Sequence, residues 1–131
     1  MPHDFKKFPE LTKRQMDFYY FQSPHKQVFE DFPCEVIKVT DGDTVRVQWS
    51  ERDFPFTVRL ADIDAPEKGT SGHKESGSWL ADQILGKKIE MQIDRDNRID
   101  KWGRLLGTII YRGVNINEVS TEIGHSKAFG S

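Results

Sequence analysis

From Pro33 to Tyr111 the chain reads as five short β-rich runs separated by turns, and this pattern most constrains its fold. Valine, isoleucine and aromatic residues recur in these runs, and one helical segment, residues 78–85, interrupts them after the third. The Asp41-Gly42 pair between the first two runs is a typical hairpin signal. The pattern therefore predicts a mainly β domain with neighbouring strands connected by tight turns.

The expected element order is β-β-β-α-β-β-α. After the hairpin, the three later strand runs cover residues 56–63, 88–93 and 105–111. Helices are expected over residues 78–85, capped by Ser78 and ended by Gly86, and over residues 116–123. Five strands in one small domain, with a helix between the third and the fourth, suit a five-stranded barrel of the OB type, an α+β fold in which strands dominate.

A chain of 131 residues fits one domain, which we place at residues 32–131, with a helical N-terminal extension over residues 1–31. No run approaches the roughly 18 apolar residues of a membrane span. The first residues lack the apolar region of a cleavable signal peptide, and Cys34 is the one cysteine. These features predict a cytoplasmic protein without disulfides and without a membrane partner, although secretion stays open if a leader precedes this sequence.

Within the N-terminal extension, Thr12 and Gln15 have the spacing of a capping box. They predict a helix over residues 13–22, which Pro24 ends. The aromatic residues 18–21 cover more than one face of this helix, so they either dock on the main domain or stack on bases. We expect a monomer, and dimerisation through this helix is the alternative.

The net charge of −2 is unevenly distributed along the chain. Residues 31–67 hold four basic and nine acidic groups, whereas the segments before and after them have a small positive excess. An acidic block binds a cation better than a phosphate, so any affinity for phosphate must come from a metal ion and a few placed arginines. The charge pattern therefore excludes a protein that coats nucleic acid through general basicity.

Five acidic residues gather at predicted strand ends and turns: Asp41, Asp43, Asp62, Asp64 and Glu67. Calcium takes about six to eight oxygen ligands from carboxylates, backbone carbonyls and water. Asp43 follows the hairpin turn and Asp64 ends the third strand, so adjacent strands can bring these two carboxylates together. The alternative is that Asp41 merely forms the turn and that the other acids are solvated.

Two arginines are candidates for phosphate binding: Arg59 on the third predicted strand and Arg104 after the loop at residues 101–103. A guanidinium group is a planar fork of donors that matches phosphate oxygens. Together with a metal ion, two such groups would neutralise the charge on a phosphorus centre under nucleophilic attack. Ion pairs with nearby surface acids are the alternative that the spacing leaves open.

Three runs, in this order, resemble the staphylococcal nuclease (thermonuclease) family. They are Val39-Thr40-Asp41-Gly42-Asp43-Thr44-Val45, then Val58-Arg59-Leu60 with Asp64-Ala65-Pro66-Glu67, and then Asp100-Lys101-Trp102-Gly103-Arg104. The resemblance covers residues 34–129 and leaves out the first thirty. It implies a calcium-dependent hydrolase that cleaves phosphodiester bonds of DNA and RNA and leaves 3′-phosphate ends.

The resemblance also implies how this chain would hold calcium and activate water. Asp43 and Asp64 resemble the two carboxylate ligands, and Ala65 resembles the ligand that offers its backbone carbonyl. Glu67 resembles the acid that positions or deprotonates the attacking water. Asp62 departs from the family pattern, which has a small or apolar residue there, so it is an extra ligand, a modifier of metal preference or a solvated acid.

The substrate contacts follow in the same way. Arg59 and Arg104 resemble the pair that clamps the scissile phosphate, and Lys101 resembles a residue beside the nucleotide's terminal phosphate. Phe129 is the one aromatic residue near the place where the best-known secreted member has a pair of tyrosines, so base stacking is either weaker here or passes to the N-terminal helix. The rival hypothesis is a barrel that binds nucleic acid or protein without cutting; degenerate copies of this kind lose arginines or carboxylates that this chain keeps.

Overall fold

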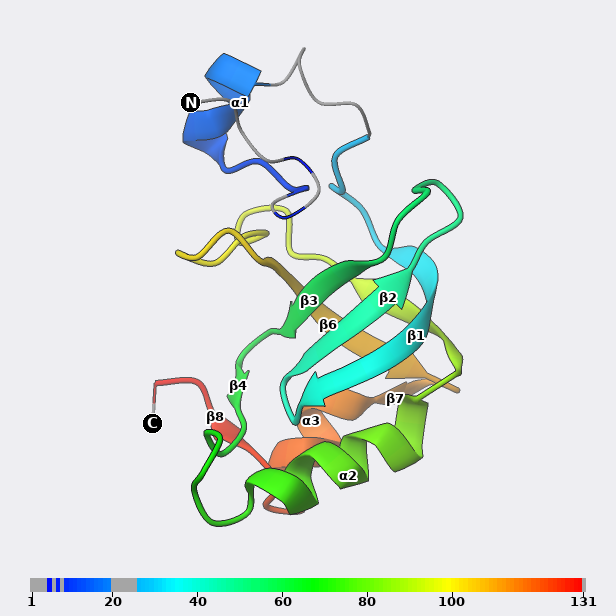
Figure 1. Cartoon of the computed structure of the whole chain (residues 1–131), viewed down its shortest axis with the longest axis vertical. Helices are drawn as coiled ribbons and strands as arrows, with labels where there is room; N and C mark the ends of the chain where they lie inside the picture. The colour runs from blue at the N-terminus through cyan, green and yellow to red at the C-terminus, as the bar shows by residue number, and fades with distance from the viewer. Residues whose placement is uncertain (1–4, 6, 8, 20–25, 131) are drawn as a thin grey trace.

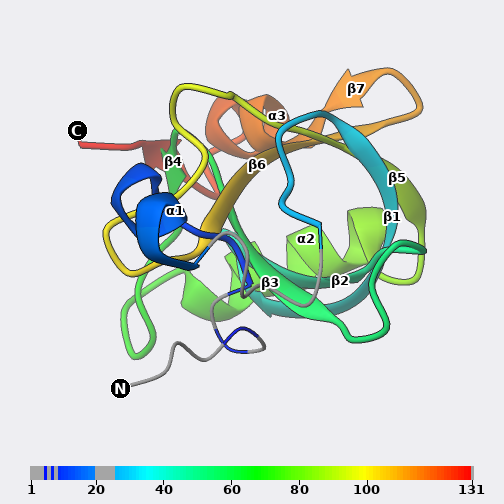
Figure 2. The same cartoon turned by 90° about the horizontal axis from the view of Figure 1, so that it is seen from above.

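In the computed structural model, which describes residues 5, 7, 9–19 and 26–130, five strands close into a barrel (Figure 1). They are β1 (Phe32–Asp41), β2 (Thr44–Gln48), β3 (Phe56–Leu60), β5 (Lys88–Gln92) and β6 (Leu105–Tyr111). Antiparallel pairing runs in the order β3–β2–β1–β5–β6, and parallel pairing of β3 with β6 closes the ring, which Figure 2 shows end-on. The expected five-stranded barrel of the OB type is therefore confirmed.

The third strand run, expected to be continuous over residues 56–63, is broken. β3 ends at Leu60, Asp62 has a φ of 65°, and a two-residue strand, β4 (Ile63–Asp64), follows. β4 leaves the barrel and pairs with another short strand, β8 (Lys127–Ala128). The expectation of one strand was wrong, because apolar alternation does not reveal a residue in the left-handed region of backbone space.

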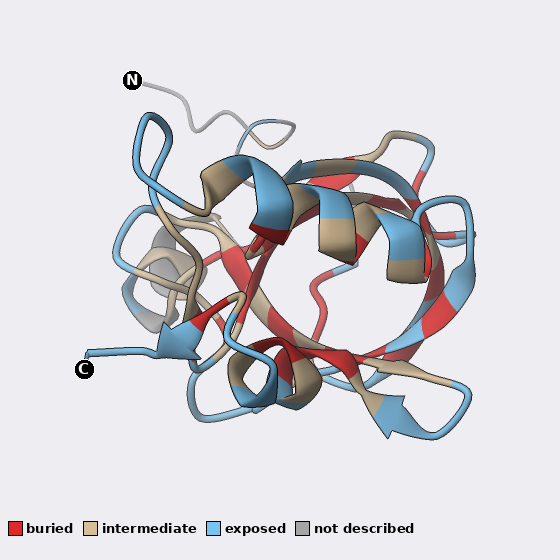
Figure 3. Ribbon diagram, turned by 90° about the horizontal axis from the view of Figure 1, so that it is seen from below, coloured by how far each residue is buried: buried red, intermediate tan, exposed pale blue. Residues whose placement is uncertain are grey.

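Helix α2 (His73–Ile84) covers one end of the barrel (Figure 3) and begins before Ser78, the expected start. Its N-cap is Gly72, which has a φ of 86° and makes no side-chain hydrogen bond, so no capping residue marks this start in the sequence. Leu80 and Ile84, four positions apart, are fully buried against the barrel. Packing of this helix face against the barrel extends the helix back over the polar residues 73–77, which the sequence pattern predicts to be a loop.

Helix α1 (Lys13–Tyr19) begins where the sequence predicts it. Thr12 Oγ1 accepts a hydrogen bond from the Gln15 amide at 3.2 Å, and Gln15 Oε1 accepts one from the Thr12 amide at 3.1 Å. This reciprocal pair confirms the capping box. The expected end of the helix at residue 22 and the aromatic residues 20–21 lie outside the described residues, so the docking or stacking of those rings stays a prediction.

Helix α3 (Ile116–Glu122) confirms the last predicted helix, and Gly124 after it has a φ of 86°. The Asn115 side chain accepts a hydrogen bond from the Glu118 amide at 3.0 Å and caps the helix. A two-residue strand, β7 (Val114–Asn115), pairs with β6 and was not expected. No helix in the described part of the chain is long and apolar enough to cross a bilayer.

The barrel interior is apolar. Its fully buried side chains come from all five strands and from α2: Val36, Val45, Val47, Val58, Leu80, Ile84, Met91 and Ile109. Cys34 is buried in the same core, and burial raises the pKa of its thiol from 9.0 to about 12. The single cysteine is therefore a small apolar core residue rather than a reactive thiolate.

The turn between β1 and β2 consists of Gly42 and Asp43, because Asp41 already pairs with Thr44. The expected hairpin is confirmed, but Gly42 does not adopt a positive φ. Glycine is needed there because a Cβ atom would lie 1.8 Å from the Oγ of Ser76 in α2. The glycine therefore permits close packing of the turn against the helix rather than a special turn conformation.

A Gly42→Ala variant is expected to be less stable than the wild type by about 1–3 kcal/mol, because Ser76 and Ala65 would have to move. Gly77→Ala is the matched control. A Cβ atom at Gly77 meets nothing closer than 4.0 Å, and alanine is preferred to glycine within a helix by about 1 kcal/mol. Urea unfolding measures both changes, and a Gly42→Ala variant as stable as the wild type would contradict the close approach.

Candidate active site

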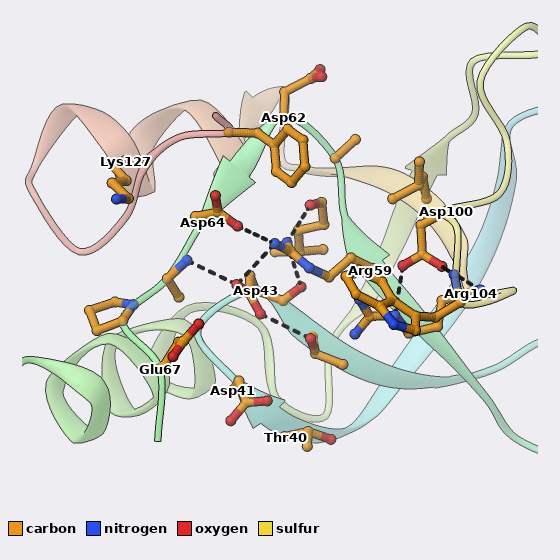
Figure 4. A pocket seen from close by; sticks show the side chains of 18 of the residues that line it. Thr40, Asp41, Asp43, Arg59, Asp62, Asp64, Glu67, Asp100, Arg104 and Lys127 are labelled. Carbon is orange, nitrogen blue, oxygen red and sulfur yellow. Dashed lines mark hydrogen bonds and ion pairs between the residues drawn. The ribbon is translucent and has the colours of Figure 1, made fainter. Parts of the chain in front are cut away.

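A pocket of about 1200 Å³ opens on one side of the barrel (Figure 4). Its walls come from the β1–β2 turn, the segment from the end of β3 to the start of α2, the β5–β6 loop (residues 93–104) and β8 with Phe129. Closure of the barrel and the pairing of β4 with β8 bring these distant segments together. The pocket is lined by every residue that the sequence singled out for catalysis, metal binding or substrate binding: Asp43, Arg59, Asp64, Ala65, Glu67, Lys101 and Arg104.

At the centre of the pocket, one guanidinium group joins the two predicted metal ligands. Arg59 Nη2 lies 2.7 Å from Asp64 Oδ1 and 3.3 Å from Asp43 Oδ2. Asp43 comes from the β1–β2 turn, Arg59 from β3 and Asp64 from β4, so three elements meet here. The strand order thus brings the two carboxylates together as expected, and both face one positive charge.

Arg59 is held in place largely by the backbone. Its side chain is only 10% exposed, and Nη1 donates hydrogen bonds to the carbonyl oxygens of Leu60 at 2.8 Å and Ile63 at 2.9 Å. A guanidinium bound to carbonyls through one nitrogen and to carboxylates through another has little freedom to move. It therefore presents its charge to the pocket with little reorganisation.

The oxygen atoms of Asp43 and Asp64 suit a hard cation. Asp43 Oδ1 accepts a hydrogen bond from Thr44 Oγ1, and its Oδ2 accepts one from the Ala65 amide, both at 2.9 Å, which fixes the carboxylate. Both carboxylates reach one cationic nitrogen, and carboxylate oxygens are ligands of the kind that calcium takes. Within residues 5, 7, 9–19 and 26–130, no third acid, histidine or cysteine joins them to form a larger metal-binding group.

Arg104 lies across the pocket from Asp64, at the end of the β5–β6 loop (Figure 4). Its Nε donates to Asp100 Oδ2 at 2.7 Å, while Asp100 Oδ1 accepts from the amides of Trp102 and Arg104, each at 2.9 Å. Asp100 thus closes a tight turn and aims the guanidinium group of Arg104. That side chain is 34% exposed, so its charge stays accessible to a ligand.

Other predicted residues line the pocket without joining the Asp43–Arg59–Asp64 cluster. Glu67 is exposed at the rim, and its carboxylate has no hydrogen bond or ion pair among the residues that the structure describes. Lys101 is also exposed, with its ammonium group 4.5 Å from the centre of the Trp102 ring.

Asp62 lines the pocket but points away from Asp43 and Asp64 in Figure 4. It is exposed, and its backbone carbonyl accepts a hydrogen bond from the Phe129 amide at 2.9 Å. This placement favours the solvated acid among the three alternatives for Asp62. The Phe129 ring is 70% exposed at the pocket edge, where an apolar surface is available to a ligand.

Asp100 and His73 shape the site, and neither is among the residues predicted from the sequence to act in it. Asp100 could have been recognised as the residue that orients the arginine four positions later through a turn. His73 connects two segments of the pocket wall. Its Nδ1 donates to the Pro66 carbonyl at 3.0 Å, and its Nε2 lies 3.7 Å from Asp41 Oδ1, so the ring ties α2 to the segment that carries Glu67.

Comparisons with known proteins identify relatives among nucleases. The family model described as "Staphylococcal nuclease homologue" matches residues 57–128. A micrococcal nuclease of Shigella flexneri is 32% identical over 108 residues, which are 76% of this chain and 59% of that protein. An uncharacterized endonuclease of Haemophilus influenzae is 32% identical over 96 residues, 73% of this chain and 52% of that protein.

A third relative extends the comparison toward the N-terminus. An uncharacterized protein of Bacillus anthracis is 28% identical over 128 residues, which cover 93% of this chain and 54% of that protein. This match therefore reaches into the N-terminal extension, which the family model leaves out. The chain spans between half and three fifths of the length of each of these three relatives.

Proposed function

The chain belongs to the family of staphylococcal nuclease homologues, and on this basis we propose that it is a calcium-dependent nuclease that hydrolyses phosphodiester bonds of DNA or RNA. The observation that carries the proposal is the meeting of Asp43, Arg59 and Asp64 in one pocket, with Arg104 on the facing wall. Relatives named as a nuclease and as endonucleases support hydrolysis of nucleic acid. A degenerate binding module would lack part of this set.

Asp43 and Asp64 would hold the calcium ion, and the Ala65 carbonyl would add a further oxygen ligand. When bound, the ion supplies positive charge that polarises the phosphate oxygens. Arg59 is fixed beside the same two carboxylates, so it would meet the phosphate next to the metal site. Arg104, aimed by Asp100, would bind the phosphate from the facing wall, and the two guanidinium groups would neutralise the charge that builds on the phosphate oxygens.

Glu67 is the group suited to activate water. Its exposed carboxylate is not engaged by other side chains in the described part of the chain, so it can accept a proton from a water molecule in the pocket. The water oxygen would form a bond to phosphorus while the bond from phosphorus to the 5′ oxygen breaks. The products would be a 3′-phosphate end and a 5′-hydroxyl end.

Cleavage assays with the purified chain test this proposal. Single-stranded DNA, plasmid DNA and RNA are incubated with calcium, and the fragments are treated with phosphatase before extension by a polymerase. We expect fragments that are extended only after removal of a 3′-phosphate. Tight binding of all three substrates without cleavage by any divalent metal ion would instead identify a non-catalytic binding module.

A Glu67→Gln variant is expected to keep the fold and lose about 10²–10⁴-fold in kcat, because the amide cannot accept the proton of the attacking water. Glu90→Gln is the matched control, since Glu90 is an exposed acid on β5 that does not line the pocket. Single-turnover cleavage rates with saturating calcium compare the two variants with wild type. Near wild-type turnover of a folded Glu67→Gln variant would remove Glu67 from the mechanism.

A further inference from the structure

A wholly buried carboxylate connects the N-terminal extension to the barrel. The described residues 9–19 and 26–31 lie over the end of the barrel opposite α2 (Figure 1). Glu10 in this segment is 0% exposed; its Oε1 pairs with Arg52, and its Oε2 accepts a hydrogen bond from Arg98 Nη2 at 2.6 Å. A buried charge without partners is strongly unfavourable, so this three-residue cluster fixes the groups that it joins.

Arg98, the member of this cluster that comes from the β5–β6 loop, is bound to the extension at several points. Its Nε donates to the Val28 carbonyl at 2.5 Å, and its Nη1 donates to the Leu11 carbonyl at 3.4 Å. The guanidinium carbon lies 4.1 Å from the centre of the Phe29 ring. Burial lowers the pKa of Arg98, and the Glu10 carboxylate opposes this shift, so the ion pair keeps the buried side chain charged.

The start of the same loop is bound to the extension as well. The Ile93 amide donates to Asp31 Oδ1 at 2.7 Å, and Arg95 Nε donates to the Phe29 carbonyl at 3.1 Å. These bonds, together with those of Arg98, attach the first half of the β5–β6 loop to the N-terminal extension. Figure 2 accordingly shows α1 close to this loop.

The second half of the loop carries the predicted substrate contacts. The Arg98 carbonyl accepts a hydrogen bond from the Leu106 amide at 2.7 Å, so the two limbs of the loop meet where Arg98 is anchored. Beyond this point, Asp100 closes the turn that aims Arg104, and Lys101 lies within that turn. The positions of the Lys101 and Arg104 side chains therefore depend on where Arg98 is held.

We propose that Arg98 is a positioning residue, through which the N-terminal extension holds the β5–β6 loop and places Arg104 at the scissile phosphate. The effect on cleavage rests on the proposed nuclease function, whereas the effect on the loop does not. Arg52 is the matched control within the same cluster. It is as deeply buried and pairs with the same carboxylate, but it lies between β2 and β3, and its Nη2 also donates to the Lys26 carbonyl at 2.8 Å.

The test compares Arg98→Met with Arg52→Met in the full chain. Both changes keep the apolar stem and remove one partner of Glu10, so both should lower the urea midpoint. Only Arg98→Met should speed hydrogen exchange at the amides of residues 99–106, by about tenfold or more relative to the amides of β1 and β2. Only Arg98→Met should lower kcat, by about 10- to 100-fold with a smaller change in KM, because a small displacement of a catalytic group has effects of this size.

Arg98→Lys serves as the second variant, because it keeps a charge beside Glu10 and folds more readily than Arg98→Met. It should lose the bond to the Val28 carbonyl and show the same loop exchange and kcat effects to a smaller degree. Equal losses of kcat in the Arg52 and Arg98 variants, or unchanged exchange of residues 99–106, would overturn the proposal. If the wild type cleaves no nucleic acid, the proposed function fails, and hydrogen exchange still decides whether the extension positions the loop.

Discussion

An Arg104→Ala variant is expected to lose about 10³–10⁵-fold in kcat, the contribution that an arginine makes when it is aimed at a phosphoryl group under attack. Its fold should be preserved, because the Arg104 side chain is 34% exposed and its ion pair and ring contact are with Asp100 and Trp102 of its own loop. The Arg104–Asp100 pair is partly buried and lies within one loop, so its loss should cost about 1 kcal/mol, the upper end of the range for surface ion pairs. Steady-state cleavage and thermal unfolding measure the two properties on the same samples.

Arg112→Asn is the control for Arg104→Ala. Arg112 is an exposed arginine with a φ of 52°, a conformation that asparagine tolerates, and it does not line the pocket. Its replacement should leave kcat within about threefold of wild type. Loss of one distant surface charge mainly changes the rate at which enzyme and nucleic acid associate, and that rate depends on the salt concentration. A similar loss of kcat in both variants would show that overall charge, and not the placement of Arg104, matters for cleavage.

Arg59 is a less clean test of the same chemistry. It is nearly buried, donates to two backbone carbonyls and pairs with Asp43 and Asp64, so its loss would leave these partners without their donor. Truncation of one member of such a group costs stability as well as activity. Loss of Arg104 is therefore the cleaner test of phosphate binding by an arginine.

Removal of calcium is expected to abolish cleavage by the wild type and to lower its melting temperature. A ligand that binds only the folded chain stabilises it by mass action, by about 2.7 kcal/mol when its concentration is a hundred times Kd. Asp43→Asn and Asp64→Asn should be inactive and should show little or no increase in melting temperature on addition of calcium. Calorimetric scans with calcium and with a chelator, next to the cleavage assay, separate loss of metal from loss of fold.

Asp62→Asn is the control for the two ligand variants. Asp62 lies within two positions of Asp64, but its side chain points away from the cluster, so its replacement should leave the response to calcium unchanged. A melting temperature of the wild type that does not depend on calcium, together with cleavage in the presence of a chelator, would rule out the calcium requirement. Loss of the calcium response in Asp62→Asn would instead make Asp62 a ligand.

Much of the fold follows from patterns that are local in the chain. β6 begins and ends at the predicted residues, 105 and 111, because a short run of mostly apolar residues is flanked there by turns. The capping box of Thr12 with Gln15 and the glycine after α3 mark helix ends through backbone groups only a few residues away. Signals of this kind need no tertiary contact to be effective.

Other parts of the fold depended on contacts between distant residues. The start of α2 at His73 is set by burial of Leu80 and Ile84 against the barrel, and the break after β3 by the pairing of β4 with β8. Glu10 lies in the N-terminal extension, outside the predicted domain, and it is paired with Arg98, which lies 88 positions away. No local pattern reveals such a partner, since a lone glutamate in a polar segment is usually solvated.

The same division holds for the candidate site. The sequence by itself determined which residues are candidates for the chemistry, because carboxylates, guanidinium groups and their spacing in three short runs are visible in the sequence. Only the tertiary structure decided how they are held: Arg59 by backbone carbonyls, Arg104 by Asp100, and the β5–β6 loop by the N-terminal extension. The reason is physical, since the orientation of a charged group depends on partners that the barrel brings together from distant parts of the chain.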